Sequence, residues 1–165
     1  MIFVAVGTHH QPFDRLILAA DRVATELDER VVIQRGPSRM PAPHAELVDA
    51  LSPAAFAAHL AEARVVVLHA GSSSFLQARA LGRRPIVVPR RPEHGEHVDD
   101  HQLRFAATLP VDEAEVVEPA ALVDAIRRHT EPRPADAIAA ADARTAAFCD
   151  RFGPLVDALV AGRRR

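Results

Sequence analysis

The sequence predicts an α/β fold built on a doubly wound, mainly parallel, Rossmann-like sheet. Short apolar runs typical of buried strands recur along the chain, stretches with helical spacing separate them, and turns rich in Gly, Ser or His follow several of the runs. Parallel strands joined by right-handed helical crossovers produce this alternation. With 165 residues, the chain has the length of one domain. We expect a single domain over residues 1–165 that includes a helical tail over residues 135–161.

The first predicted unit is a strand, a loop and a helix. Ile2 to Val6 form an apolar run suited to a buried strand, which ends in Gly7-Thr8-His9-His10. Apolar residues then recur every three or four positions over residues 13–27, and Pro12 lies close to the expected helix start. Val31 to Ile33 form the next apolar run, so a second strand follows this helix.

The middle of the chain repeats this pattern. Residues 46–51 suit a short strand, and Ser52 is placed to cap a helix over residues 53–63. Val65 to Leu68 form a continuous β-branched and apolar strand. A His-Ala-Gly turn then leads into a helix that begins among Ser72, Ser73 and Ser74.

Two further strands and three helices complete the prediction. Ile86 to Val88 form a strand, and a polar loop leads to Asp99 or Asp100, either of which suits the cap of a helix. Val116-Val117 suit a last short strand, and residues 119–129 suit a last crossover helix. The tail over residues 135–161 has apolar residues three and four positions apart. We expect that helix to kink or stop at Pro154.

Composition and charge narrow the class of protein. The 20 cationic and 22 acidic residues give a net charge of -2, which argues against a nucleic-acid partner. Cys149, as the one cysteine, forms no internal disulfide, and no apolar run has the length of a membrane span. The first residues also lack the charged start and apolar region of a signal peptide, so we expect no export. We therefore expect a cytoplasmic protein, with peripheral contact at the inner face of the plasma membrane as a further expectation because of the Arg163-Arg164-Arg165 end.

Two turns are candidates for binding a phosphate group. Ligands of open parallel sheets bind beyond the carboxyl ends of the strands, where Gly7-Thr8 and Gly71 to Ser74 are expected. Backbone N–H groups at a helix N-terminus favour an anion. Neither turn matches G-x-G-x-x-G, and a chain without Lys has no P-loop, so dinucleotide and Walker-type sites are excluded. The alternatives are ordinary tight turns and a structural His69.

Charged residues divide between the two ends of the sheet. Arg90 and Arg91 follow a strand, so they are candidates for contact with a diphosphate or a partner. Arg83 and Arg84 precede the same strand and are expected as solvated surface at the opposite end.

A histidine-rich loop resembles a set of metal ligands. His94, Glu96, His97 and His101 lie close together in the sequence. Their spacing matches neither H-E-x-x-H nor H-x-x-E-H, and most of them precede the helix. We therefore predict no metal site.

These segments together carry a family resemblance. In order, they are Ile2-Phe3-Val4-Ala5-Val6-Gly7-Thr8-His9, Gln34-Arg35-Gly36, His69-Ala70-Gly71, Pro85-Ile86-Val87-Val88-Pro89 and Asp100-His101-Gln102. Over about residues 1–130, the chain resembles the C-terminal, donor-binding domain of family 28 glycosyltransferases. It is most similar to the stand-alone type found in bacterial exopolysaccharide and capsule synthesis and in the catalytic subunit of the dolichol-linked N-acetylglucosaminyltransferase.

The resemblance implies a fold, a reaction and partners. The fold is the C-terminal half of a GT-B enzyme, and the donor is a UDP-sugar. Transfer inverts the anomeric centre and needs neither metal nor cofactor. The acceptor is a sugar on a polyprenyl diphosphate, presented by a membrane-anchored subunit. We expect the isolated chain to be incomplete as an enzyme, with the apolar tail helix contacting that subunit or a second copy.

The resemblance also implies roles for individual residues. Those expected at the donor are Gly7, Thr8, His69, Gly71, Ser73, Ser74, Gln77 and Gln102. Gly7 and Thr8 face the diphosphate, and Gln102 holds sugar hydroxyls. Gln77 stands where the family has an acidic residue that accepts hydrogen bonds from the ribose. His9 is the candidate for proton transfer.

Three departures from the family motif support a rival hypothesis. Gln77 replaces a carboxylate, Ser73 replaces the second glycine of the His-Ala-Gly motif, and His10 replaces a common Glu. The rival is a catalytically silent nucleotide-sugar-binding subunit. A nucleotide-sugar epimerase or hydrolase fragment is a weaker alternative, because a complete two-domain enzyme needs about twice this length.

Overall fold

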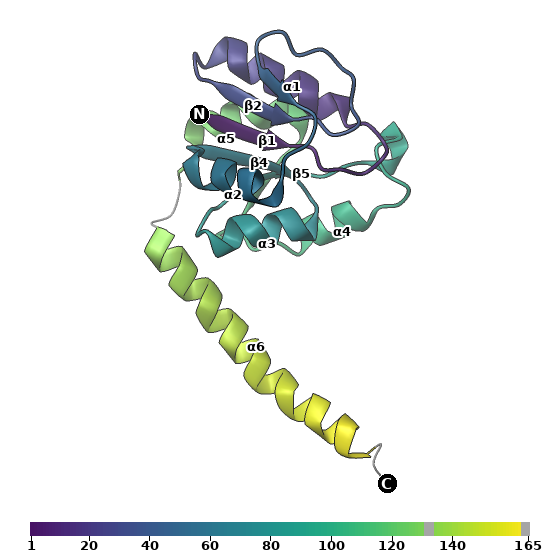
Figure 1. Ribbon diagram of the computed structural model, residues 1–165, viewed down its shortest axis with the longest axis vertical. Coiled ribbons are helices and arrows are strands. Elements are labelled where there is room, and N and C mark those ends of the chain that lie inside the picture. Colours follow the sequence, from purple (N-terminus) through teal and green to yellow (C-terminus); the bar gives the residue numbers. More distant parts are fainter. Residues whose placement is uncertain (131–133, 163–165) are drawn as a thin grey trace.

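A computed structural model describes residues 1–130 and 134–162, and the predicted Arg163-Arg164-Arg165 contact with lipid lies outside these residues. The fold is the predicted doubly wound sheet (Figure 1). All strand pairs are parallel, in the order β3-β2-β1-β4-β5-β6. The strands are β1 (Ile2–Ala5), β2 (Val31–Gln34), β3 (Glu46–Val48), β4 (Val65–His69), β5 (Ile86–Val88) and β6 (Glu115–Val116).

Helices cover both faces of this sheet. They are α1 (Asp14–Glu26), α2 (Pro53–Glu62), α3 (Ser72–Ala80), α4 (His101–Ala107), α5 (Leu122–Arg128) and α6 (Pro134–Gly162), with short 3₁₀ turns at η1 (Pro92–His94) and η2 (Pro119–Ala121). The helix predicted over residues 119–129 is therefore a 3₁₀ turn followed by α5. Helix α1 begins later than Pro12 suggested, with Phe13 as its N-cap.

The core forms because successive strand residues point to opposite faces. In β1, Ile2 and Val4 pack with α1 and α5, whereas Phe3 and Ala5 pack on the other face with Leu60 of α2. A third cluster joins Phe75 of α3 to α4. The central strands β1, β2, β4 and β5 are buried on both faces, as expected for a parallel sheet between two helical layers.

Capping residues in the sequence mark where α2 and α4 begin. Ser52 accepts a hydrogen bond from Ala55 N and caps α2, as predicted. At α4, the N-cap is Asp100, but its side chain makes no capping bond. The neighbouring Asp99 carboxylate instead accepts a bond from His101 N at 3.1 Å.

Helix α6 extends away from the sheet (Figure 1). It contacts α3, and Arg144 forms an ion pair of 2.6 Å with Glu113. Of the two outcomes expected at Pro154, a kink or a stop, the stop is wrong, because the helix continues to Gly162. Proline lacks one N–H donor, and here the loss of that single bond does not end the helix.

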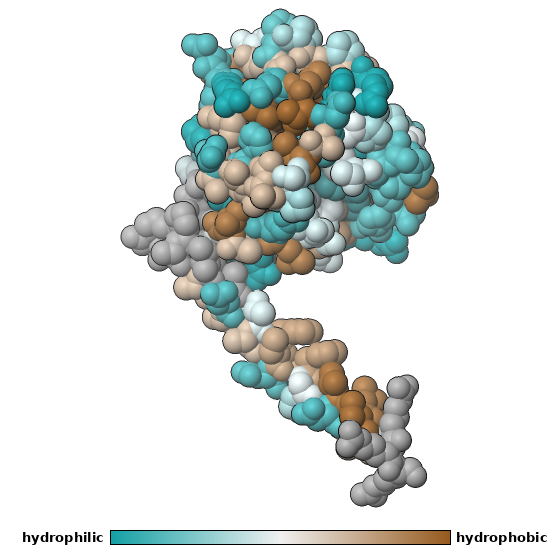
Figure 2. All heavy atoms as spheres, in the orientation of Figure 1, coloured by the Kyte–Doolittle hydropathy of each residue, from teal (hydrophilic) through white to brown (hydrophobic). Residues whose placement is uncertain are grey.

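The distal part of α6 carries exposed apolar side chains, and Figure 2 shows them gathered towards its C-terminal end. Phe148 and Phe152 stack with ring centroids 5.3 Å apart, although each is about half exposed. No helix in residues 1–130 or 134–162 combines the length and apolar character that a membrane crossing requires.

Candidate functional site

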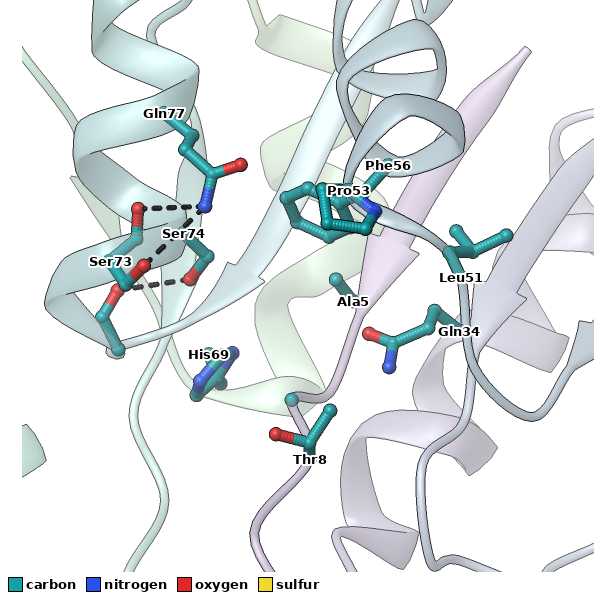
Figure 3. A pocket seen from close by; sticks show the side chains of 12 residues that line it. Ala5, Thr8, Gln34, Leu51, Pro53, Phe56, His69, Ser73, Ser74 and Gln77 are labelled. Atoms are coloured by element: carbon teal, nitrogen blue, oxygen red, sulfur yellow. Dashed lines mark hydrogen bonds between the residues drawn. The ribbon is translucent and has the colours of Figure 1, made fainter.

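A pocket of about 290 Å³ opens at the carboxyl ends of β1, β2 and β4. Figure 3 shows its polar and apolar walls facing each other. It is lined by Ala5, Gly7, Thr8, Gln34, Leu51, Pro53, Phe56, His69, Gly71, Ser73, Ser74 and Gln77. This is the edge of the sheet at which the strand polarity predicted a ligand site.

The first turn of α3 forms the polar wall. No side chain caps this helix, whose N-cap is Gly71. Ser74 Oγ donates to Gly71 O at 2.9 Å. Glycine has no side chain to accept from the first backbone N–H groups of α3, so these groups face the pocket uncapped. These N–H groups and the helix dipole favour an anionic ligand at this wall.

His69 at the end of β4 lies between two glycines. A Cβ on Gly7 would approach His69 Nε2 to 2.6 Å, and a Cβ on Gly71 would approach the same atom to 2.3 Å. Both positions therefore need glycine, and Gly7 additionally has a φ of +85°. The lack of a side chain at Gly7 and Gly71 therefore makes room for the His69 ring as well as for a bound ligand.

The protonation state of His69 follows from this packing. Burial lowers its pKa to about 4, and the Arg90 guanidinium adds to the shift, whereas the Ala5 carbonyl opposes it. His69 is thus neutral at pH 7. One ring nitrogen then carries a proton and the other a lone pair.

Gln77 faces the pocket from the second turn of α3, as Figure 3 shows. Its amide nitrogen donates weakly, at 3.4 Å, to Ser73 O and Ser73 Oγ. Among the residues that the structure describes, the hydrogen bonds of Gln77 involve only its amide nitrogen, so its oxygen can accept one from a ligand hydroxyl.

The opposite wall is apolar and was not predicted. Leu51, Pro53 and Phe56 come from the segment between β3 and α2. Phe56 falls within the helix predicted over residues 53–63, and its ring contacts Phe3 edge to face with centroids 5.5 Å apart. Since periodicity does not distinguish a core face from a pocket wall, the sequence carried no signal for this side. Gln34, by contrast, was placed at this edge by the end of its strand.

The pocket gathers most of the predicted donor residues. These are Gly7, Thr8, His69, Gly71, Ser73, Ser74 and Gln77. His9, Gln102, Arg90 and Arg91 do not line it.

Arg90 requires a correction. Its predicted role as a diphosphate or partner contact is wrong, because its side chain is fully buried. The guanidinium donates to Val6 O and Glu96 O at 2.8 Å and to Gln11 O at 2.7 Å. Burial lowers its pKa to about 10, against the opposing effect of Glu96. Arg90 is a structural cation that ties the loop after β1 to the loop after β5.

The other arginine assignments change as well. Arg91 is partly exposed but paired with Glu118 and, at 3.0 Å, with Glu93. Arg83 and Arg84 are not simply solvated: Arg83 donates to Ala61 O at 3.1 Å, and Arg84 donates to Val111 O at 2.8 Å. Exposed backbone carbonyls at element ends attract guanidinium groups, and sequence patterns do not reveal them.

Gln102 and His9 also lie apart from the pocket lining. Gln102 is buried, and its Oε1 accepts a bond from Arg90 N at 3.2 Å. Gln102 therefore holds the start of the loop after β5 and does not offer a free side chain to a sugar. His9 contacts Gln11 Oε1 through Nε2 at 2.8 Å, and its ring stacks on His97.

The histidine-rich loop separates into two groups. Glu96 turns away to form a bidentate pair with Arg15, at 2.6 and 2.8 Å. His97 and His101 instead converge with Asp99, which sequence reasoning treated as a cap. Burial lowers the pKa of His97, and His9 and His101 reinforce this effect.

A family model described as "Glycosyltransferase family 28 C-terminal domain" matches residues 1–150. No curated protein sequence matches the chain.

Several solved structures that share this fold are glycosyltransferases. The calicheamicin glycosyltransferase CalG4 is 19% identical with a TM-score of 0.57, and the match covers 92% of this chain and 43% of CalG4. MurG of Acinetobacter baumannii is 17% identical with a TM-score of 0.52 and coverages of 75% and 40%. The glycotransferase of kitacinnamycin is 18% identical, with a TM-score of 0.52 and coverages of 83% and 36%. The chain thus spans about two fifths of the length of these proteins.

Proposed function

The chain belongs to the family 28 glycosyltransferase C-terminal domain family, and on that premise we propose that it binds a UDP-sugar and supplies the donor half of a glycosyltransferase. This membership confirms the resemblance inferred from the sequence motifs. The family implies a nucleotide-sugar donor and an acceptor. UDP as the nucleotide, inversion at the anomeric carbon and independence of metal for transfer are parts of the proposal.

One observation carries the proposal: the uncapped start of α3 faces Thr8 and His69 across one pocket. Free N–H groups at a helix N-terminus, a hydroxyl and a neutral imidazole are donors suited to a diphosphate. They would also stabilise the charge that develops on the departing UDP, which is electrostatic catalysis without a covalent intermediate.

The rest of the pocket suits a nucleoside. Leu51, Pro53 and Phe56 offer an apolar surface for a planar base, and Gln77 offers an amide oxygen to the ribose hydroxyls. In this arrangement the base lies against the apolar wall and the diphosphate lies at the turn around Gly71. The sugar points towards the open side of the pocket.

The acceptor and the second half of the site require a partner. We infer a lipid-linked sugar as acceptor, presented at the cytoplasmic membrane face by a membrane-anchored subunit. The exposed Phe148 and Phe152 of α6 supply an apolar surface for that subunit or a second copy. His9 remains the candidate for proton transfer because it follows Thr8 in the same loop, although it does not line the pocket.

A calorimetric titration of the full chain with UDP tests the donor site, with ADP as the matched control. We expect saturable binding of UDP and weaker binding of ADP. Transfer to a lipid-linked acceptor should remain low until the acceptor-binding subunit is added. Robust transfer by this chain alone in detergent would refute the requirement for a partner.

A silent nucleotide-sugar-binding subunit is the second candidate. It is favoured by Gln77, which offers the ribose a neutral amide where the family has a carboxylate. UDP binding without transfer, even with the partner present, would support this candidate.

A further inference from the structure

We propose that His97, Asp99 and His101 form a binding site for one divalent transition-metal ion, with Zn²⁺ as the ion that best suits these donor atoms. These residues are not among those that line the nucleotide pocket, and the proposal does not depend on the proposed glycosyl transfer. It departs from the sequence analysis, which predicted no metal site.

The geometry brings one ligand atom from each residue together. All three atoms lie within 4.8 Å of one another. Asp99 Oδ1 lies 3.5 Å from His97 Nδ1 and 2.5 Å from His101 Nδ1. In a tetrahedral zinc site with bonds of about 2.0–2.2 Å, ligand atoms lie about 3.4 Å apart. The three ligand atoms therefore lie near the spacing that a zinc site needs. His97 Nδ1 now accepts a hydrogen bond from Val98 N at 3.0 Å and would exchange that bond for the ion.

The donor set has the right chemistry. Two imidazoles and one carboxylate are ordinary ligands of Zn²⁺, and they leave a fourth position open to water. The metal would replace the hydrogen bond between His101 Nδ1 and the Asp99 carboxylate, in which the ring is the donor because an ionised carboxylate can only accept. His101 then keeps its proton on Nε2, so the exchange needs a change of tautomer and no net loss of a proton from that ring.

The loop holds these ligands before any metal is added. The His97 side chain is only 7% exposed, and its ring stacks on His9 with centroids 4.2 Å apart. The His101 ring meets His97 edge to face at 4.3 Å. Because the ligands occupy alternate positions from His97 to His101, where the loop joins α4, binding closes only short chain segments and costs little loop entropy.

Helix capping explains only part of this arrangement. Asp99 accepts the His101 backbone N–H and thereby caps the first turn of α4. That role requires neither imidazole, whereas the proposed site uses both. The substitution Asp99→Asn separates the roles, because an amide oxygen still accepts the backbone bond but the negative charge is lost.

The experiment is a titration of the chelator-treated full chain with Zn²⁺, in a Cys149→Ser background because Cys149 is an exposed thiol. We expect one equivalent of Zn²⁺ to bind. His101→Ala and Asp99→Asn should each weaken binding at least tenfold. A matched control is His44→Ala, which removes an exposed histidine paired with Asp21 at 3.0 Å and leaves the cluster intact.

Co²⁺ provides an independent readout, since tetrahedral coordination gives strong visible absorption that octahedral coordination lacks. The absorption should appear with wild-type ligands and disappear in His101→Ala. The proposal is overturned if no saturable equivalent binds in the Cys149→Ser background, if His101→Ala binds as tightly as the parent, or if His44→Ala causes the same loss. Thermal unfolding of each variant verifies that it is folded.

Discussion

The imidazole of His69 occupies the space that a side chain at Gly71 would need, since a Cβ there would lie 2.3 Å from His69 Nε2. Gly7 borders the same ring from the other strand end, at 2.6 Å. The ring therefore cannot move away from one glycine without approaching the other.

Gly71→Ala should consequently destabilise the fold by about 1–3 kcal/mol, the usual cost of overpacking. It should also weaken UDP binding, because the displaced ring borders the pocket. Urea denaturation measures the first effect and calorimetry the second. In a His69→Ala background, where the obstructing ring is absent, the same substitution should cost much less. An equal cost in both backgrounds would contradict the steric explanation.

His69 should make the stability of the chain fall in mild acid. Its pKa is lowered to about 4 by burial and by Arg90, with smaller effects from His97 and His101. Between pH 6.5 and 4, the unfolded chain binds a proton that the folded chain does not, so folding loses stability as the pH falls. The loss from this group is about 2 kcal/mol between pH 7 and 4.5.

The measurement is the free energy of unfolding against pH, with a chelator present, for the parent and for His69→Asn. The variant should show a shallower dependence over this range. Identical slopes would mean that another group causes the acid sensitivity.

Gln77→Glu should tighten UDP binding or leave it unchanged. A carboxylate accepts hydrogen bonds from ribose hydroxyls more strongly than an amide, by about 1 kcal/mol or up to about fivefold in affinity. Calorimetry with UDP provides the measurement. Leu76→Glu adds the same charge on an exposed position of α3 that does not line the pocket and should bring no gain. Weaker binding in Gln77→Glu would argue against a ribose contact at this position.

Arg90→Ala and Arg91→Ala should differ sharply in stability. Removing Arg90 leaves a cavity and unpaired carbonyl groups at Val6, Gln11 and Glu96, at a cost of about 3 kcal/mol or more. Arg91 forms partly exposed ion pairs, so its loss should cost about 1 kcal/mol or less. Chemical denaturation compares the two variants. Similar small losses would show that Arg90 does not hold the two loops together.

Phe148→Ser combined with Phe152→Ser should leave the unfolding free energy of the domain nearly unchanged, because both rings are about half exposed on α6. Transfer activity with the acceptor-binding subunit should fall if this face contacts it, as should activity after truncation following Thr130. UDP affinity of the isolated chain serves as the control and should not change. Full activity in the double variant would place the partner contact elsewhere.

The sequence alone determined the sheet and the edge at which the pocket opens. Apolar runs such as Val65 to Leu68 are long enough to be buried on both faces, and the glycine and serine turns after Val6 and His69 could meet only at the carboxyl ends of parallel strands. Both properties follow from local patterns together with the fixed polarity of a parallel sheet.

Only the tertiary structure decided which atoms the individual polar side chains contact. Arg90 looked free to reach a ligand, but it is buried against Val6, a residue far away in the sequence. Asp99 looked like a cap, yet it also faces His97 and His101. Phe56 lies in a predicted helix that carried no sign of a ligand site, yet it forms part of a pocket wall. A strand pattern is set by neighbours along the chain, whereas the partner of a charge is set by whichever distant atoms the fold brings within hydrogen-bond reach.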